Sequence, residues 1–136
     1  MVLYCPALDL PTLLKDNFSA SDLEKWKEEG ELKIDGPEGN PANLHYEFIQ
    51  DILKNHSSIP NIPSHISTLI MHGTRDEVIP VQLSDSFASV NEHISFSSIE
   101  DGDHALTDSI PTLLFNTLKF LGNMDHMPQV KDVASL

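Results

Sequence analysis

Hydrophobic residues occur along this chain in short blocks whose spacing distinguishes strands from helices. The clearest block covers residues 66–71, a β-branched and largely apolar run that ends at a polar turn beginning with His72. Such a run, bounded by turn formers, is typical of a strand buried in a sheet. Beyond the turn, Pro80 suits the first position of a helix, and apolar residues continue at a helical period to about residue 91. The pattern therefore predicts a strand, a polar turn and a helix in succession.

Two further strands are predicted before and after this central one. Residues 2–5 form an apolar run closed by Pro6, which indicates a strand from the middle of a sheet, buried on both faces. Residues 93–99 alternate apolar side chains with serines, so we expect a third strand there. Residues 7–17 and 35–41 lack a clear period and contain turn formers, so we expect irregular connections.

A short helix is predicted over residues 21–30. Ser21 and Glu24 form the capping-box pattern at its start. Its only apolar pair is Leu23 and Trp26. So narrow a stripe predicts a small element that lies over a site or an edge, rather than a core helix.

Two other segments have broader helical faces. Residues from about 43 or 44 to 54 place apolar side chains on a wide face and predict a core helix. A final helix is predicted to begin with Asp108 as its cap and to stop at Gly122. Its predicted helical face consists of Ile110, Leu113, Leu114, Thr117, Leu118 and Leu121. The order is then strand, helix, helix, strand, helix, strand, helix. This order is typical of an α/β fold with about three parallel strands, flanking helices and right-handed crossovers.

Composition excludes several classes of protein. The chain has 136 residues, 40% of them hydrophobic, which is enough for one domain with a core. Its 8 basic and 21 acidic residues give a net charge of −13, so nucleic acid and anionic membranes are poor partners. No apolar run approaches the roughly 20 residues of a membrane-spanning helix, and the first residues lack the basic flank of a signal peptide. We therefore expect a cytoplasmic protein.

Neither a metal nor a cofactor is expected. Cys5 is the only cysteine, so no internal disulfide can form and a metal cage of several cysteines is excluded. Its position in a predicted strand indicates a small buried hydrophobe. The side chains that could be combined as a metal site are His72, Asp76, Asp103 and His104. No pair of histidines at helical spacing supports that combination.

Two polar turns that follow predicted strands carry the clearest chemistry. Asp76 follows the central strand, and His104 follows the strand over residues 93–99. The carboxyl ends of neighbouring parallel strands meet at one edge of a sheet, where α/β folds place their sites. An aspartate that holds an imidazole in one tautomer is the supporting half of a Ser-His-Asp triad. Asp101 and Asp103 are alternative partners for His104, but we expect them to be solvated loop residues.

A series of short motifs runs along residues 2–121 in a fixed order. They are Leu3-Tyr-Cys-Pro-Ala7, Trp26-Lys-Glu-Glu-Gly30, Tyr46-Glu-Phe48, the acid turn His72 to Pro80, the turn Gly102-Asp-His104, and Phe120-Leu121. Together they resemble the carboxy-terminal half of the small single-domain serine esterases in the α/β-hydrolase superfamily. The resemblance implies a partial α/β-hydrolase fold that acts on carboxylic esters, with Asp76 as the triad acid and His104 as the general base. It also implies that Trp26 lies in a small cap segment over the acyl pocket. Trp26 and Val78 are the candidate substrate contacts, although packing is the more common role for a tryptophan such as Trp26.

The sequence departs from this family at the nucleophile. Family members carry it upstream of the acid in a Gly-x-Ser-x-Gly elbow. The residues two positions after each glycine are Leu32, Glu38, Pro41, Arg75, His104 and Met124. None is a serine, cysteine or aspartate, so the sequence contains no elbow. The strand over residues 2–5 also begins without the strands that precede it in the family. We therefore expect a carboxy-terminal portion that is inactive alone.

These expectations define a domain organisation and its partners. Residues 1–122 are expected to form the carboxy-terminal part of one hydrolase domain, with a cap-like segment and loop over residues 18–45 and a loose tail over residues 123–136. An ester substrate is expected only when an amino-terminal half completes the site. The alternative is a non-catalytic interaction module, or a truncated gene product, that pairs or forms homo-oligomers through the exposed sheet edge at residues 2–5. Thioesterase, peptidase and lipase activities use the same acid and base and remain open.

Overall fold

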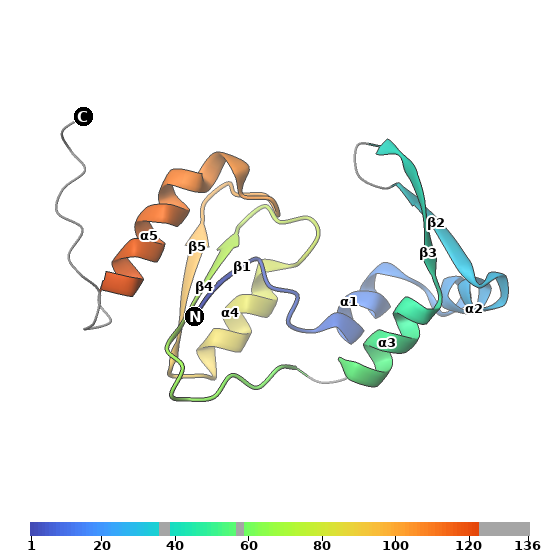
Figure 1. The fold of residues 1–136 in the computed structure, drawn as a ribbon, viewed down its shortest axis with the longest axis horizontal. Coiled ribbons are helices and arrows are strands. Elements are labelled where there is room, and N and C mark those ends of the chain that lie inside the picture. Colours follow the sequence, from blue (N-terminus) through green and yellow to red (C-terminus); the bar gives the residue numbers. More distant parts are fainter. Residues whose placement is uncertain (36–38, 57–58, 123–136) are drawn as a thin grey trace. The chain divides into compact units, whose positions relative to one another are not determined.

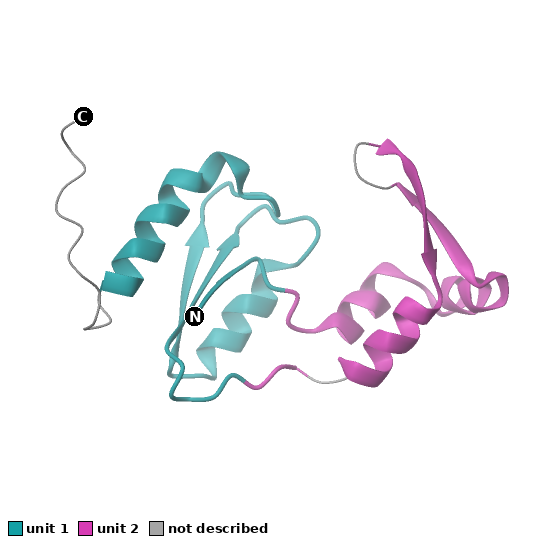
Figure 2. Ribbon diagram, viewed as in Figure 1, with its two compact units in different colours: residues 1–6, 62–136 teal, residues 7–61 magenta. Residues whose placement is uncertain are grey.

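The computed structural model describes residues 1–35, 39–56 and 59–122 (Figure 1). They divide into two compact units (Figure 2): unit 1 comprises residues 1–6 and the chain from residue 62 onward, and unit 2 comprises residues 7–61. In the sequence, unit 2 therefore lies between the first strand of unit 1 and the remaining residues of that unit. The cap-like segment expected over residues 18–45 belongs to unit 2, and the expected tail over residues 123–136 lies outside the described residues.

Unit 1 is built on a parallel sheet of three strands in the order β1-β4-β5. The strands are β1 (Val2–Tyr4), β4 (Thr68–Gly73) and β5 (Ile94–Ile99). Ile70 in β4 lies opposite Leu3 in β1 and Phe96 in β5. All six residues of β4 are buried. The continuous, largely apolar run thus lies in the central strand, because a parallel strand covered on both faces consists mainly of apolar side chains.

Strand β1 does not have the central position that its sequence predicts. In the described part of the chain it pairs only with β4 and is an edge strand. Its Tyr4 side chain is exposed, and Val2 and Leu3 are only half-buried. An apolar edge strand of this kind leaves a row of unpaired backbone groups along one side.

Helices α4 (Val81–Ser89) and α5 (Ile110–Gly122) lie on either side of the sheet (Figure 1). The main apolar cluster of unit 1 consists of Cys5, Leu69, Met71, Ile99 and Leu106, with Val2, Leu113 and Phe120 packed against it. Two of the packed residues belong to α5, so this helix covers that face of the sheet. Strands that alternate with helices therefore form the parallel α/β arrangement that their order predicts.

Helix α5 differs from its prediction in two respects. Asp108 is not its cap, because it lies in the short 3₁₀ helix η2 (Thr107–Ser109) that precedes α5. Leu113 packs on the core, but Leu114 and Leu118, predicted on the same face, are exposed. A sheet of three strands offers a narrow surface, so it covers only part of the apolar face. Neither α5 nor any other helix in the described part of the chain is long and apolar enough to cross a membrane.

The described residues of unit 2 include three α-helices and a β-hairpin. The helices are α1 (Leu10–Asn17), α2 (Ala20–Glu29) and α3 (Glu47–Asn55). The hairpin consists of β2 (Glu31–Asp35) and β3 (Pro41–His45), which pair in antiparallel fashion. The sequence patterns did not predict α1 or the hairpin.

Local chemistry explains these differences. Helix α1 forms because the Asp9 carboxylate accepts the N–H of Thr12 at 3.1 Å, and because Pro11 lies in the first turn, where its missing N–H is tolerated. The capping box of α2 pairs Ser19 with Asp22, two residues earlier than the predicted pair. Residues 43–45, predicted to be helical, extend β3 because exposed and half-buried side chains alternate along that strand.

Trp26 belongs to the interior of unit 2. Its side chain is 1% exposed, and the indole N–H donates to the Leu44 carbonyl at 2.9 Å. Its ring lies 5.4 Å from that of Phe18 and 6.3 Å from that of Tyr46, measured between centroids. Helix α2 is therefore a core helix of this unit, contrary to the prediction from its narrow stripe, because one large aromatic side chain provides the packing surface.

The turns that follow β4 and β5 are held together by a close approach of two glycines. The N–H of Arg75 donates to the Gly102 carbonyl at 2.9 Å. A Cβ on Gly73 would collide with that carbonyl group and would lie 2.7 Å from the backbone carbonyl oxygen of Asp103. Neither glycine has a positive φ. The absence of a side chain is thus required by the contact between the two backbones.

We predict that Gly73→Ala lowers the free energy of unfolding by about 1–3 kcal/mol, because the added Cβ forces the two turns apart. Urea unfolding followed by circular dichroism measures this change. Gly122→Ala is the matched control: apart from its own helix backbone and chain neighbours, no atom of the described residues lies within 4 Å of its added Cβ, so its stability should be equal or slightly higher. Equal stability of Gly73→Ala and the unsubstituted chain would contradict the proposed contact.

Candidate active site

Asp76 is held in the turn after β4 by the backbone of its own loop. Its Oδ1 atom accepts the N–H of Val78 at 2.9 Å and the N–H of Ile79 at 2.8 Å. This is the local pattern in which an aspartate bonds to the backbone two and three residues ahead. The Asp76 side chain has no exposed surface. One carboxylate oxygen is therefore used to fix the loop, which leaves Oδ2 for other partners.

His104 is one of those partners. It lies in the loop between β5 and η2, and its Nδ1 atom is 2.9 Å from Asp76 Oδ2. An ionised carboxylate can only accept, so Nδ1 carries the proton and donates it. The His104 side chain is 43% exposed. The neutral ring therefore has its lone pair on Nε2, the nitrogen that remains free to accept a proton.

A second histidine, His72, contacts the same carboxylate oxygen, Asp76 Oδ2. Its side chain is fully buried at the end of β4, and its Nε2 atom lies 2.9 Å from Asp76 Oδ2 and 2.9 Å from the Ile79 carbonyl. Since the carbonyl can only accept, Nε2 carries a proton. Nδ1 lies 2.7 Å from Ser84 Oγ, which donates to it when the ring is neutral. The sequence indicates His72 as a candidate metal ligand, but not as a partner of Asp76. Its place near the end of a buried strand, four residues before Asp76, is the sequence feature that could have indicated this contact.

Cys5 adds a further donor to Asp76. It follows β1, is 6% exposed and has a φ of 42°, in the left-handed region that L-residues rarely adopt. Burial is the main cause that raises the pKa of its thiol to about 11, and a hydrogen bond to the Asp76 carboxylate raises it further. The burial expected for Cys5 is present, but its thiol also has a polar partner that the sequence did not predict.

These donors keep Asp76 ionised. Burial alone would raise the pKa of Asp76, but hydrogen bonds from the Ile79 N–H, His104, the Val78 N–H and Cys5 outweigh it. The result is a pKa of about 2, below the ordinary value of 3.8. At neutral pH the carboxylate is therefore a fixed negative charge beneath the His104 ring.

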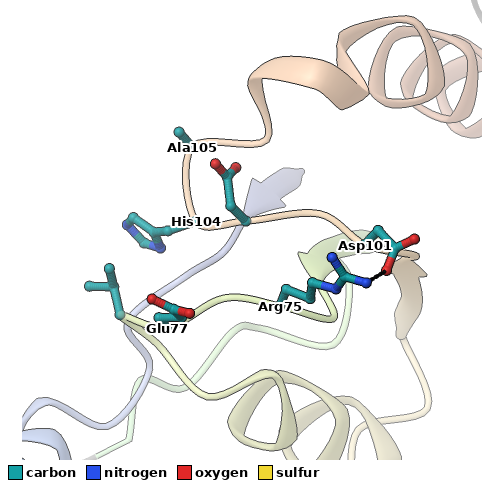
Figure 3. A pocket seen from close by; sticks show the side chains of 7 residues that line it. Arg75, Glu77, Asp101, His104 and Ala105 are labelled. Carbon is teal, nitrogen blue, oxygen red and sulfur yellow. Dashed lines mark ion pairs between the residues drawn. The ribbon is translucent and has the colours of Figure 1, made fainter.

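A surface pocket of about 530 Å³ opens beside His104 (Figure 3). Its lining consists of Arg75, Glu77, Val78, Asp101, Asp103, His104 and Ala105. Arg75 and Asp101 form an ion pair of 2.6 Å across its wall, and Figure 3 shows this pair apart from the His104 ring. Asp103 Oδ1 accepts the N–H of Leu106 at 2.7 Å. Both aspartates thus have partners other than His104.

The structure brings together some of the predicted site residues. Asp76 and His104 meet in unit 1, and Val78, which is 56% exposed, lines the pocket beside them. Trp26 is buried in unit 2 and has almost no free surface to offer a substrate. The contacts of His72 and Cys5 with Asp76 were not predicted from the sequence.

The arrangement of strands and helices has a counterpart among solved structures. A solved structure with a similar fold is that of the alpha/beta hydrolase domain-containing protein 10 from mouse, with a TM-score of 0.64 and 22% sequence identity. The similarity covers 90% of this chain and 51% of that one, so the chain spans about half the length of the solved protein. No family model and no curated protein matches the sequence. The structure is part of an α/β-hydrolase fold.

We predict that Asp76 makes stability depend on pH in the acid range. Its folded pKa of about 2 lies below 3.8, so the ionised form stabilises the fold. This stabilisation is fully present above pH 3.8 and is lost as the pH falls through about 2. Urea unfolding measured across this window should show a smaller loss for Asp76→Asn than for the unsubstituted chain.

Asp22 provides the control for this measurement. Its pKa is lowered by hydrogen bonds from the Ser19 side chain and backbone, but the group is fully exposed at the start of α2. Asp22→Asn should therefore change the acid dependence less than Asp76→Asn does. Identical acid dependence in all three proteins would contradict the burial and hydrogen bonding described for Asp76.

Proposed function

We propose that this chain supplies the acid and the base of a serine-type carboxylic-ester hydrolase, and that the nucleophile comes from a segment outside its 136 residues. The observation that carries this proposal is the 2.9 Å contact between His104 Nδ1 and Asp76 Oδ2, with the His104 ring half-exposed at a pocket. The α/β-hydrolase fold supports the same class of chemistry, although a fold alone does not define a reaction.

The two residues would act as the supporting part of a triad. His104 Nε2 accepts the proton of a serine hydroxyl as its oxygen attacks the ester carbonyl. Asp76 stabilises the resulting imidazolium and keeps the ring oriented through Nδ1. His104 then gives the proton to the alcohol that leaves. In the second half of the cycle the same nitrogen takes a proton from water, which releases the acid and regenerates the serine.

The free edge of β1 is the entry point that we propose for the nucleophile segment. The Cys5 N–H donates to Met71 O at 2.9 Å, and Leu69 N–H donates to Met1 O at 2.9 Å. The backbone groups of Val2 and Tyr4 therefore alternate to the other side of β1, where a further parallel strand can pair. The carboxyl end of such a strand would lie at the same end of the sheet as the turns that carry Asp76 and His104.

Serines within this chain are poor substitutes for that nucleophile. Ser84 is fully buried and lies 2.7 Å from His72, not from His104. Ser98 lies in β5 and Ser109 in η2, and neither has a glycine-flanked elbow. Loss of the nucleophile in a serine hydrolase costs a factor on the order of a million in rate. The chain alone is accordingly expected to be inactive.

The test is reconstitution with a candidate amino-terminal half that carries a Gly-x-Ser-x-Gly elbow. We predict that hydrolysis of a short p-nitrophenyl ester and labelling by a fluorophosphonate appear only when both parts are co-expressed. Asp76→Asn should lower the rate on the order of 10⁴-fold, because the carboxylate no longer fixes the proton of His104 on Nδ1. His104→Ala should abolish the activity. His65→Ala, a change at an exposed histidine of the same unit, is the matched control and should keep full activity.

Two results would contradict this proposal. Fluorophosphonate labelling of the isolated chain would mean that it contains its own nucleophile. Full activity of His104→Ala in the reconstituted pair would mean that another base serves the reaction.

A second candidate function is a non-catalytic interaction module that associates through the same free edge of β1. The observation that favours it is that β1 pairs with β4 alone in the described part of the chain. A strand with one unpaired side can add a strand from a second copy or from another protein.

For this alternative we predict that the isolated chain sediments as a dimer or larger species. Val2→Pro should return it to a monomer, because proline removes an N–H that faces the free edge while the bonds from β1 to β4 persist. Val2→Ala keeps the N–H and is the control. A stable monomer of the unsubstituted chain would contradict association through this edge.

A further inference from the structure

We propose that Cys5, His72 and Asp76 form a buried binding site for a soft divalent cation such as Zn²⁺, and that the cation, when bound, separates Asp76 from His104. One ligand atom from each of the three residues lies within 4.8 Å of the other two. The binding site stands on this geometry alone. Its consequence for catalysis rests on the function proposed above.

The three residues converge from distant parts of unit 1. Cys5 follows β1, His72 ends β4, and Asp76 lies in the turn after β4. The side chains of His72 and Asp76 have no exposed surface, and Cys5 is 6% exposed. The left-handed backbone of Cys5 ends the strand at the position where its thiol reaches the Asp76 carboxylate. A cation could thus be bound by preformed groups with small shifts of side chains.

The types of donor define the class of cation. Thiolate, imidazole and carboxylate together are a zinc-type ligand set, and the sulfur disfavours magnesium and calcium, which prefer oxygen. The sequence suggested a different combination, His72 and Asp76 with Asp103 and His104, and no pair of histidines at helical spacing supported it. The Asp103 side chain bonds to the Leu106 N–H instead, and Cys5 takes the third position.

Protons balance when the cation binds. The proton on His72 Nε2 moves to Nδ1, where the Ser84 hydroxyl oxygen can accept it. Asp76 is already ionised, so it releases none. The Cys5 thiol loses its proton to solvent. One proton is therefore released for each cation, and the net charge of the three side chains with the cation changes from −1 to zero, which favours a buried site.

The cation and His104 compete for the same oxygen. Asp76 Oδ1 is occupied by two backbone N–H groups, whereas Oδ2 faces both imidazole rings. A cation between Cys5, His72 and Asp76 takes Oδ2, and His104 loses the acceptor that fixes its tautomer. Zinc would accordingly act as a reversible inhibitor of the Asp76–His104 pair.

The direct test is titration of the full chain with Co²⁺, whose absorption reports both its ligands and its geometry. We expect one Co²⁺ per chain, a thiolate-to-cobalt charge-transfer band, the visible bands of tetrahedral cobalt, and displacement of all of them by Zn²⁺. Calorimetry in two buffers should give one proton released per cation. Because Cys5 is the only cysteine, the charge-transfer band can come from no other sulfur. A folded chain that lacks this band at saturating Co²⁺ would overturn the proposal.

Variants identify the ligands. Cys5→Ala should lose the charge-transfer band, and His72→Gln should weaken Co²⁺ binding at least about tenfold. His65→Ala, exposed and remote in sequence from the cluster, should bind as the unsubstituted chain does. Circular dichroism verifies that each variant is folded. Unchanged Co²⁺ affinity in a folded His72→Gln chain would overturn the assignment of His72.

Activity of the reconstituted hydrolase tests the consequence separately. Zn²⁺ should inhibit it at the concentrations that fill the site, and Cys5→Ala should reduce this inhibition relative to its own zinc-free rate. Full activity with the site saturated would overturn the separation of Asp76 from His104. If the pair of chains has no activity at all while cobalt binds, the proposed function fails and the cation site stands.

Discussion

One buried carboxylate determines the chemistry of unit 1. Asp76 has no exposed side-chain surface, and yet it stays ionised because backbone N–H groups and imidazoles surround it with hydrogen-bond donors. A buried charge is stable only when such donors offset its lost hydration. The loop after β4 and the orientation of His104 both depend on it. His72 Nε2 contacts Asp76 Oδ2, the same oxygen that accepts from His104 Nδ1.

The sheet brings these donors together without help from unit 2. The turns after β4 and β5 meet because Gly73 and Gly102 allow their backbones to touch, and β4 aligns with β5 in register. This part of the structure was predictable from the sequence. The apolar run of β4 is continuous, and an acid and a histidine each follow a strand, so adjacency of the strands brings the two side chains together.

The remaining features depend on information that short windows of sequence do not contain. Residues 43–45 fit a helical period and a strand alternation equally well, and only pairing with β2 decides between them. The burial of Trp26 depends on Phe18 and Tyr46, which contact it from other elements. Cys5 meets Asp76 across more than 70 positions, so no local pattern reveals that contact. Most of the missed features therefore depend on residues distant in the chain, and the contact of His72 with Asp76, four residues later, is the exception.

The lining of the pocket has a consequence for the release of product in the ester hydrolysis that we propose. Glu77, Asp101 and Asp103 contribute three carboxylates, and its one guanidinium, that of Arg75, is already paired with Asp101. Under the proposed function, an uncharged ester would enter such a pocket, and the acid formed from it would leave as an anion at neutral pH. Like charges repel, and the repulsion weakens with added salt. The carboxylates of the pocket would therefore speed release of the anionic product and limit its rebinding, most strongly at low ionic strength.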